Sequence, residues 1–395
     1  MNKNLKFKDL FNENNEPNWD FIETIPEFKK LASTKQSSVW HKEGDALTHT
    51  KLVTQVMLDN MQEMKVDPTS EYYVMMMAAA ICHDLGKGCT TKWDAEKKDW
   101  ACKRHGFASA RIIRTLFYHE DIDLREKVCY MARHHMTLHH IFDKPERTTK
   151  ALIRLSCGLV TVQDMNILNW CDSMGSQTDE QTDEQVAERF TKIAKLCKQM
   201  KCYTERYPDF KNDWHMMEFF RNQDYKLPTD VEVPEQSNHP RLNIIVMVGV
   251  PGSGKDYYFE HECASLGMKM LSRDVIRTEI GLTGDKPQGT KAQEEEVTKI
   301  FNERMLEYCK NAQSFVINNT NVRKEYRSVY LDMCLPYYPR IIYVYCESPD
   351  LSVNKERRHR MMPDKVIDRM WNDMEFPEPI EYCDGIIFKQ EKNLK

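Results

Sequence analysis

The sequence has little that would place it in a membrane or export it from a cell. No apolar run approaches the roughly 18 residues of a membrane-spanning helix, and the first twenty residues, "MNKNLKFKDLFNENNEPNWD", contain no apolar signal-peptide core. We therefore expect a cytoplasmic protein with no membrane partner.

Paired cysteines and an excess of positive charge are also absent. The 13 cysteines are an odd number, lie scattered and include no CxxC pair, which favours reduced, buried thiols over disulfides or structural zinc. The net charge of −5 gives no bulk attraction to nucleic acid, so any polynucleotide contact must come from local patches.

Two different sequence patterns divide the chain. From about residue 19 to 220, apolar residues recur at helical spacing, as in "DALTHTKLVTQVMLDNMQEM", and no alternating strand pattern competes. We expect an all-α helical bundle over residues 1–225. The proline-containing polar stretch 226–241 has no helical period and is the expected linker.

The last part of the chain, 242–395, predicts an α/β domain with a parallel sheet. Short apolar runs rich in Ile and Val alternate there with helical stretches, a pattern typical of strands buried on both faces. These runs are 242–250, 314–318, 340–345 and 385–388.

A phosphate-binding loop follows the first of these runs. The stretch "GVPGSGKDYY" has the spacing Gly249-x-x-x-x-Gly254-Lys255, in which backbone N–H groups approach phosphate oxygens and the lysine faces the β- and γ-phosphates. We expect ATP with Mg²⁺ here, although Asp256 stands where serine or threonine is usual. The candidate ATP contacts are Gly249, Gly252, Ser253, Gly254, Lys255 and Asp256.

The segment "MLSRDVIRTEIG" places Asp274 and Arg277 one helical turn apart, just beyond a short strand. A carboxylate there can accept a proton from an attacking hydroxyl, and an arginine can hold a phosphate with two hydrogen bonds. Taken alone, the pair fits a surface ion pair equally well.

The phosphate-binding loop, "RDxxR", "NNTN" (318–321) and the lid "NKERRHRMMPDKVIDRMW" together resemble bacteriophage and bacterial polynucleotide 5′-kinases over nearly all of residues 242–395. The resemblance implies that Asp274 is the general base, that Arg277 contacts the substrate phosphate, and that lid arginines contact ATP. It does not say which lid arginine is catalytic; the candidates are Arg357, Arg358 and Arg360. Asn319, a candidate substrate contact, replaces the aspartate of the phage motif.

Histidines and aspartates recur along the helical half. "AAAICHDLGKG" contains His83 and Asp84 side by side, and further candidates lie in or beside helical segments, so that a bundle could gather them in one pocket. Such ligands suit Mn, Fe, Co, Ni or Mg. The further candidates are His49, His105, His134, His135 and Asp172.

This array resembles the HD-domain phosphohydrolases over about residues 40–175, and comes close to the HD domain of some bacterial CCA-adding enzymes through "HxEGD…HT" and "CHDLGKG". The resemblance implies one metal on His49, His83, Asp84 and Asp172. It implies a second metal on His105 with His135 or His134. Lys87 would neutralise a phosphate oxygen, and Asp164 is the rival of Asp172. We assign His119, His139 and His140 to the surface or to internal hydrogen bonds.

The order of the two halves resembles the HD-Pnk group of end-healing enzymes. This implies phosphorylation of 5′-OH ends and removal of 2′,3′-cyclic or terminal phosphate at 3′ ends of RNA or DNA, followed by a separate ligase. The first alternative is an HD nucleotide phosphatase joined to a small-molecule kinase. A helical half that only binds RNA, and a toxin-type kinase acting on a nucleotide sugar, are weaker alternatives. The sequence decides neither RNA against DNA nor the oligomeric state.

Overall fold

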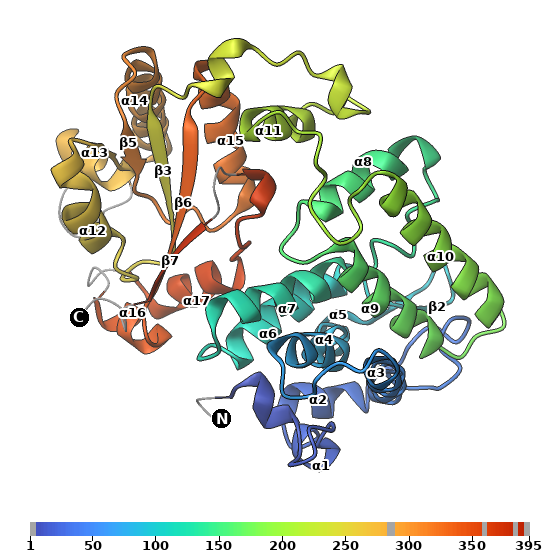
Figure 1. The fold of residues 1–395 in the computed structure, drawn as a ribbon. Coiled ribbons are helices and arrows are strands. Elements are labelled where there is room, and N and C mark those ends of the chain that lie inside the picture. The colour runs from blue at the N-terminus through green and yellow to red at the C-terminus, as the bar shows by residue number, and fades with distance from the viewer. Residues whose placement is uncertain (1–4, 283–288, 358–361, 382–385, 391–395) are drawn as a thin grey trace. The chain divides into compact units, whose positions relative to one another are not determined.

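The computed structural model describes residues 5–282, 289–357, 362–381 and 386–390 (Figure 1). The chain forms two compact units, Met1–Pro208 and Asp209–Lys395. Among the described residues, no helix combines the length and hydropathy that a membrane crossing requires.

The first unit is a helical bundle, as predicted. Asp45 caps α3 by accepting hydrogen bonds from the backbone of Leu47 and Thr48. The helix α4 is buried along most of its length and contacts both α3 and α7, so its strongly apolar sequence reflects a central position. The helices are α1 Trp19–Ile22, α2 Pro26–Leu31, α3 Ala46–Glu63, α4 Glu71–Cys82, α5 Lys87–Thr90, α6 His105–Leu116, α7 Ile122–His134, α8 Pro145–Ser156, α9 Val162–Met174 and α10 Asp183–Gln199, with the 3₁₀ turn η1 Phe7–Leu10.

A small antiparallel hairpin interrupts this all-α pattern. Its strands, β1 Lys92–Asp94 and β2 Asp99–Ala101, pair Trp93 with Trp100. Three residues per strand are too few to produce a visible alternation, which is why the sequence did not reveal them.

The second unit contains a parallel five-stranded sheet in the order β4-β5-β3-β6-β7, which confirms the predicted α/β fold. Tyr258 packs with Ile245 and Met247 on one side of the sheet. Tyr308 contacts Phe315 with a centroid distance of 5.4 Å. The strands are β3 Asn243–Val248, β4 Lys269–Leu271, β5 Phe315–Ile317, β6 Arg340–Glu347 and β7 Ile386–Gln390. The helices are α11 Asp213–Arg221, α12 Lys255–Tyr258, α13 Arg273–Glu279, α14 Lys291–Lys310, α15 Lys324–Cys334, α16 Leu351–Arg357 and α17 Asp364–Asn372.

The division between the units lies at residues 208 and 209, earlier than the predicted end of the first domain at 225. Helix α11 belongs to the second unit, because the Trp214 Nε1 group donates to the Leu335 carbonyl at 2.9 Å. The predicted linker 226–241 also lies in the second unit, where His215 Nε2 contacts the Pro228 carbonyl at 2.8 Å. Side-chain hydrogen bonds thus fix a stretch whose composition suggested a free linker.

The cysteines in the described part of the chain are free thiols, in line with the prediction. Most are buried, whereas Cys89 is exposed and Cys102 is partly so.

Candidate metal centre and phosphate-binding loop

A cluster of buried histidines and aspartates gathers at the centre of the first unit. Its members come from five separate segments of the bundle, and each is at most 8% exposed. The cluster consists of His49 from α3, His83 and Asp84 at the end of α4, His105 at the start of α6, His135 just after α7, and Asp172 from α9.

The cluster forms two trios of side chains, and one carboxylate faces both of them. In the first trio, His49, His83 and Asp172 place their ligand atoms within 4.8 Å of one another, and Asp84, His105 and His135 do so in the second. Asp84 faces both, because its Oδ2 lies 3.2 Å from His83 Nε2 and its Oδ1 lies 3.3 Å from His105 Nε2. This arrangement suits two cations with Asp84 between them.

Hydrogen bonds fix the histidine tautomers so that Nε2 faces the cluster. The Nδ1 atoms of His83, His105 and His135 lie 2.7–2.8 Å from backbone carbonyl oxygens. A carbonyl can only accept, so each Nδ1 carries the proton. Such outer contacts are typical of metal-bound histidines.

His105 and His135 provide the strongest test of whether a metal fits. Their Nε2 atoms are 2.9 Å apart. Burial lowers the pKa of both rings, that of His135 to about 3, so both are neutral at pH 7. Two lone pairs then face each other in a buried site, an arrangement that a cation between them would stabilise.

In the first trio a proton can take the place of a cation. Burial alone would lower the pKa of His83, but the carboxylates of Asp84 and Asp172 raise it to about 10. A metal binding here would displace that proton.

Glu43 supports the cluster, although the sequence analysis gave it no role. Its Oε1 lies 3.0 Å from His49 Nδ1 and 2.8 Å from His41 Nδ1. Burial would raise the pKa of Glu43, but its contacts with His41 and His49 hold it well below the usual range. The signal was present in "HKEGDALTHT", in which Glu43 follows His41 and precedes His49.

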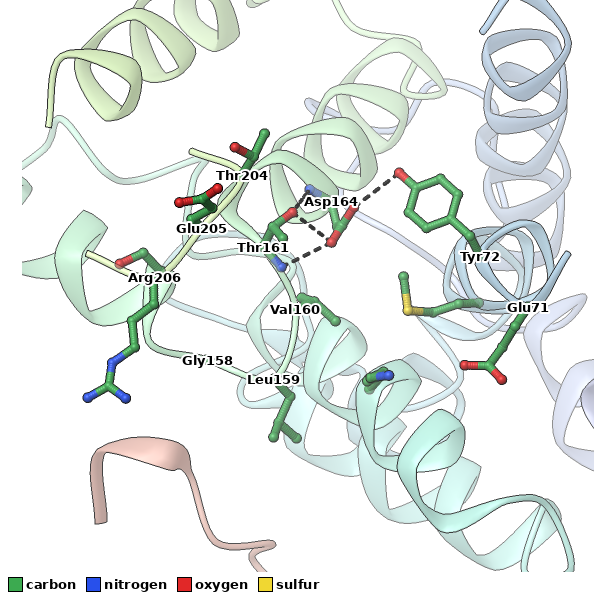
Figure 2. Close-up of a pocket in the computed structure, with 13 residues that line it drawn as sticks. Glu71, Tyr72, Gly158, Leu159, Val160, Thr161, Asp164, Thr204, Glu205 and Arg206 are labelled. Atoms are coloured by element: carbon green, nitrogen blue, oxygen red, sulfur yellow. Dashed lines mark hydrogen bonds between the residues drawn. The ribbon is translucent and has the colours of Figure 1, made fainter. Parts of the chain in front are cut away.

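Asp172, rather than its rival Asp164, joins the cluster. The Asp164 carboxylate accepts hydrogen bonds from Thr161 and Tyr72. It lines a separate cavity of about 420 Å³ between α4, α7 and the start of α9 (Figure 2). The position of Asp164 is thus accounted for by helix capping.

The structure places two of the other histidines, His134 and His139, differently from what the sequence predicted. His134 lies in neither trio of the described residues; its ring packs against Tyr130 at a centroid distance of 4.5 Å. His139, assigned to the surface or to internal hydrogen bonds, lies with its Nε2 3.1 Å from Asp172 Oδ2 and so adjoins the centre. His140 is exposed and contacts Asp143, and His119 packs against Tyr118.

Lys87 lies beside the cluster, as its place one turn after His83 suggested. Its Nζ is 2.7 Å from Asp84 Oδ2 and donates to Gln36 Oε1 at 2.7 Å. Burial would lower the pKa of Lys87, but Asp84 raises it. The ammonium is therefore charged and positioned to meet an anion that reaches Asp84.

In the second unit, the loop between β3 and α12 has the conformation of a phosphate-binding loop. Gly252 and Gly254 have φ angles of 77° and 91°, which favour glycine. A Cβ on Gly252 would lie 2.8 Å from the Asn354 carbonyl oxygen. Lys255 Nζ donates to the Gly249 and Val250 carbonyls at 3.0 and 2.9 Å, and Ser253 lies beside it, 3.5 Å away.

Two asparagines of "NNTN" reach the loop and α13. Asn318 Nδ2 donates to Asp256 Oδ1 at 2.6 Å, a contact that the sequence did not suggest. Asn319 Oδ1 accepts from the backbone of Arg273 at 3.1 Å. Asp256 is exposed, so its carboxylate can also meet a cation.

Asp274 and Arg277 interact, and a second carboxylate joins them. The Asp274 side chain is 90% exposed, and its Oδ1 accepts from Arg277 Nη1 at 2.5 Å. Glu294 of α14 accepts from Nε and Nη2 of Arg277, both at 2.8 Å. Glu294 raises the pKa of Arg277 and orients its guanidinium, a role that the motif alone did not indicate.

The lid helix α16 contacts the phosphate-binding loop, because Asn354 Nδ2 donates to the Pro251 carbonyl at 3.0 Å. Arg357 is the last residue of α16 and is exposed. Arg358 and Arg360 lie outside the described residues.

Two family models match the chain, one in each unit. An HD domain matches residues 47–165, which includes the cluster except Asp172. An AAA domain matches residues 244–377, which includes the phosphate-binding loop, Asp274, Arg277 and Arg357.

Among curated proteins, the chain is similar to the Multifunctional CCA proteins of Actinobacillus pleuropneumoniae serotype 5b (strain L20) and serotype 7 (strain AP76). Each is 25% identical over 176 residues, which cover 43% of this chain and 41% of the relative. The chain thus spans about two fifths of the length of these relatives.

Among solved structures, the chain is similar to a sugar kinase from Janibacter sp. HTCC2649 and a gluconokinase from Sinorhizobium meliloti 1021. The sugar kinase is 17% identical with a TM-score of 0.30, and the match covers 38% of this chain and 87% of that chain. The gluconokinase is 18% identical with a TM-score of 0.26, and the match covers 38% of this chain and 84% of that chain. These likenesses are too low to bear on the substrate. The family matches and the geometry of the two sites together show an N-terminal HD domain followed by a C-terminal AAA domain that contains a phosphate-binding loop.

Proposed function

We propose that this chain heals broken nucleic-acid ends, chiefly those of RNA. The C-terminal unit would phosphorylate 5′-OH ends with ATP, and the N-terminal unit would remove 2′,3′-cyclic or terminal phosphate from 3′ ends. The observation that supports the proposal is that one chain joins an HD domain with a buried cluster of histidines and aspartates to an AAA domain with a phosphate-binding loop. On one small molecule the two reactions would cancel, whereas on the two ends of a broken strand they prepare both for a separate ligase.

The kinase reaction would use the groups around the phosphate-binding loop. The loop and Lys255 hold the ATP phosphates with Mg²⁺, for which Asp256 offers an oxygen. As the 5′ oxygen bonds to the γ-phosphorus and the bond to ADP breaks, the exposed Asp274 carboxylate takes the hydroxyl proton. Arg277, oriented by Glu294, holds the neighbouring substrate phosphate. The lid arginines Arg357, Arg358 and Arg360 would cover the ATP phosphates, and Asn319 would contact the substrate.

The hydrolase reaction would take place at the buried cluster. His49, His83, Asp84 and Asp172 would hold one divalent ion; Asp84, His105 and His135 would hold a second. When bound, Mn, Ni, Co, Fe or Mg supplies an activated water and positive charge at the phosphate. Lys87 adds a further charge beside Asp84, and burial strengthens these interactions by excluding bulk water.

The test is an incubation with ATP, Mn²⁺ or Mg²⁺ and an oligoribonucleotide that bears a 5′-OH and a 2′,3′-cyclic phosphate, with both ends analysed. A DNA oligonucleotide of the same sequence with a 3′-phosphate serves as the competing substrate. Free nucleosides and sugars serve as competing phosphate acceptors. We expect both ends of the RNA to change. Phosphorylation of nucleosides or sugars without any change in the oligonucleotides would instead support the alternative of a nucleotide phosphatase joined to a small-molecule kinase.

A further inference from the structure

Most of the exposed large apolar side chains of the first unit lie close in sequence to residues of the metal centre or to the segments that contact it. Six large apolar residues are exposed among its described residues. Met64 follows the last residue of α3, 15 residues beyond His49 and so about 22 Å from it along the helix. The other five are Val39, Trp40, Trp93, Phe107 and Met136. Clustered exposed apolar groups mark binding surfaces more often than isolated ones do.

Their positions along the chain connect them to the cluster. Trp40 precedes His41, and Met136 directly follows the ligand His135. The hairpin that carries Trp93 joins α5, which begins at Lys87, to α6, which begins at His105. Asp99 of this hairpin accepts from Ser37 Oγ at 2.5 Å, so the hairpin is held against the loop that precedes His41.

Basic side chains accompany these aromatic residues. The guanidinium groups of Arg104 and Arg133 lie over the Phe107 ring, 4.7 and 4.2 Å from its centroid. Lys35 Nζ lies over Trp100 at 5.5 Å, and Trp100 contacts Trp93 with a centroid distance of 5.6 Å. Arg104 is exposed and has no carboxylate partner among the described residues. Its charge is therefore available to an anion.

Phe107 lies two residues after the ligand His105, and Arg133 lies two residues before the ligand His135. At 3.6 residues per turn, such positions point to the other side of a helix, so this group lies outside the metal pocket. A mononucleotide bound at the cluster would not extend to it. A longer strand that leads away from the cluster would.

We propose that these aromatic and basic residues bind the unpaired nucleotides next to the phosphate-bearing end, so that the N-terminal unit acts on polynucleotides rather than mononucleotides. This inference rests on the proposed function and specifies its substrate class. Bases of single strands stack on aromatic rings, and arginines hold the backbone phosphates. The charge complementarity comes from the exposed Lys35 and Arg104, although the chain as a whole is acidic.

Two measurements on the full chain test the proposal. The first compares kcat/KM for phosphate release from a short unpaired RNA with a 2′,3′-cyclic end and from adenosine 2′,3′-cyclic phosphate. We expect Phe107→Ala and Trp93→Ala to lower the value for RNA by about tenfold more than the value for the mononucleotide. The second measurement irradiates the wild type with RNA that carries 5-iodouridine next to its 3′ end, and maps the cross-linked peptides. We expect peptides that contain Trp93 or Phe107.

Met64→Ala is the matched control, since Met64 is 43% exposed against 40% for Phe107 and should change neither value. Phe107→Tyr should restore the activity lost in Phe107→Ala. Equal loss on both substrates, or cross-links confined to residues 209–395, would overturn the inference and leave the end-healing proposal standing. If the wild type releases phosphate from neither substrate, the proposed function fails, and the cross-link map alone decides whether the surface binds RNA.

Discussion

The two sites of this chain are built in opposite ways. The metal centre draws six buried side chains from distant segments of a helical bundle, each oriented by a second contact. The phosphate-binding site is largely one contiguous loop at the end of a strand, and its chemical groups, Asp256 and Asp274, are exposed. The first is therefore a packed site whose members depend on one another, whereas the second combines a buried lysine, Lys255, with carboxylates that solvent reaches.

The largest effect should come from the carboxylate that faces both metal trios. Asp84→Ala removes a proposed ligand of both ions, so we expect 3′-end phosphate release to fall below detection while 5′ phosphorylation continues. Both activities are measured on one preparation of the folded protein. Loss of both would show that the two units do not work independently.

The next effect concerns the exposed carboxylate of the kinase site. Asp274→Asn keeps the shape but cannot take a proton, so 5′ phosphorylation should fall by about 10²–10⁴-fold with phosphate release unchanged. Kinase kcat with saturating ATP measures it. A change of less than about threefold would remove Asp274 from the role of general base.

Side chains that only orient ligands should have smaller effects. Glu43→Gln leaves every proposed ligand in place but weakens the orientation of His49, so metal affinity should fall by about 10–100-fold. Titration of the chelator-stripped protein with Mn²⁺ measures this. His105, in contrast, is itself a proposed ligand, but only of the second ion. His105→Ala should therefore weaken binding and leave about one ion in the first trio, and a wild type that binds less than one ion per chain would contradict the two-metal arrangement.

The smallest effect is expected at Asp256. Without a metal ion, repulsion between the Asp256 carboxylate and the triphosphate costs up to several kcal/mol at short range. With a metal ion bound, the same carboxylate becomes a ligand. Asp256→Ser should therefore stay active with a weaker dependence on divalent ion, and Asp256→Ala should lose more activity than Asp256→Ser. Kinase rates across a Mg²⁺ series provide the measurement. An inactive wild type that Asp256→Ser activates would show instead that the loop has decayed.

The sequence by itself determined the fold classes and the local motifs. Helical periodicity, buried β-runs and the GxxxxGK loop depend on neighbours along the chain, so they are visible without a structure. "CHDLGKG" likewise put His83, Asp84 and Lys87 together, because the three lie close in sequence between the end of α4 and the start of α5.

Tertiary structure alone decided the rest, because these choices depend on contacts between segments far apart in sequence. Packing of α6 against α7 placed His135, and not His134, opposite His105. The contact of α3 with α9 brings Asp172 to His49, a pairing that the resemblance implied but that no local pattern shows. The contact of α13 with α14 gives Arg277 its partner Glu294. Helix α11 joined the second unit because Trp214 bonds to Leu335, across a separation that no local pattern encodes.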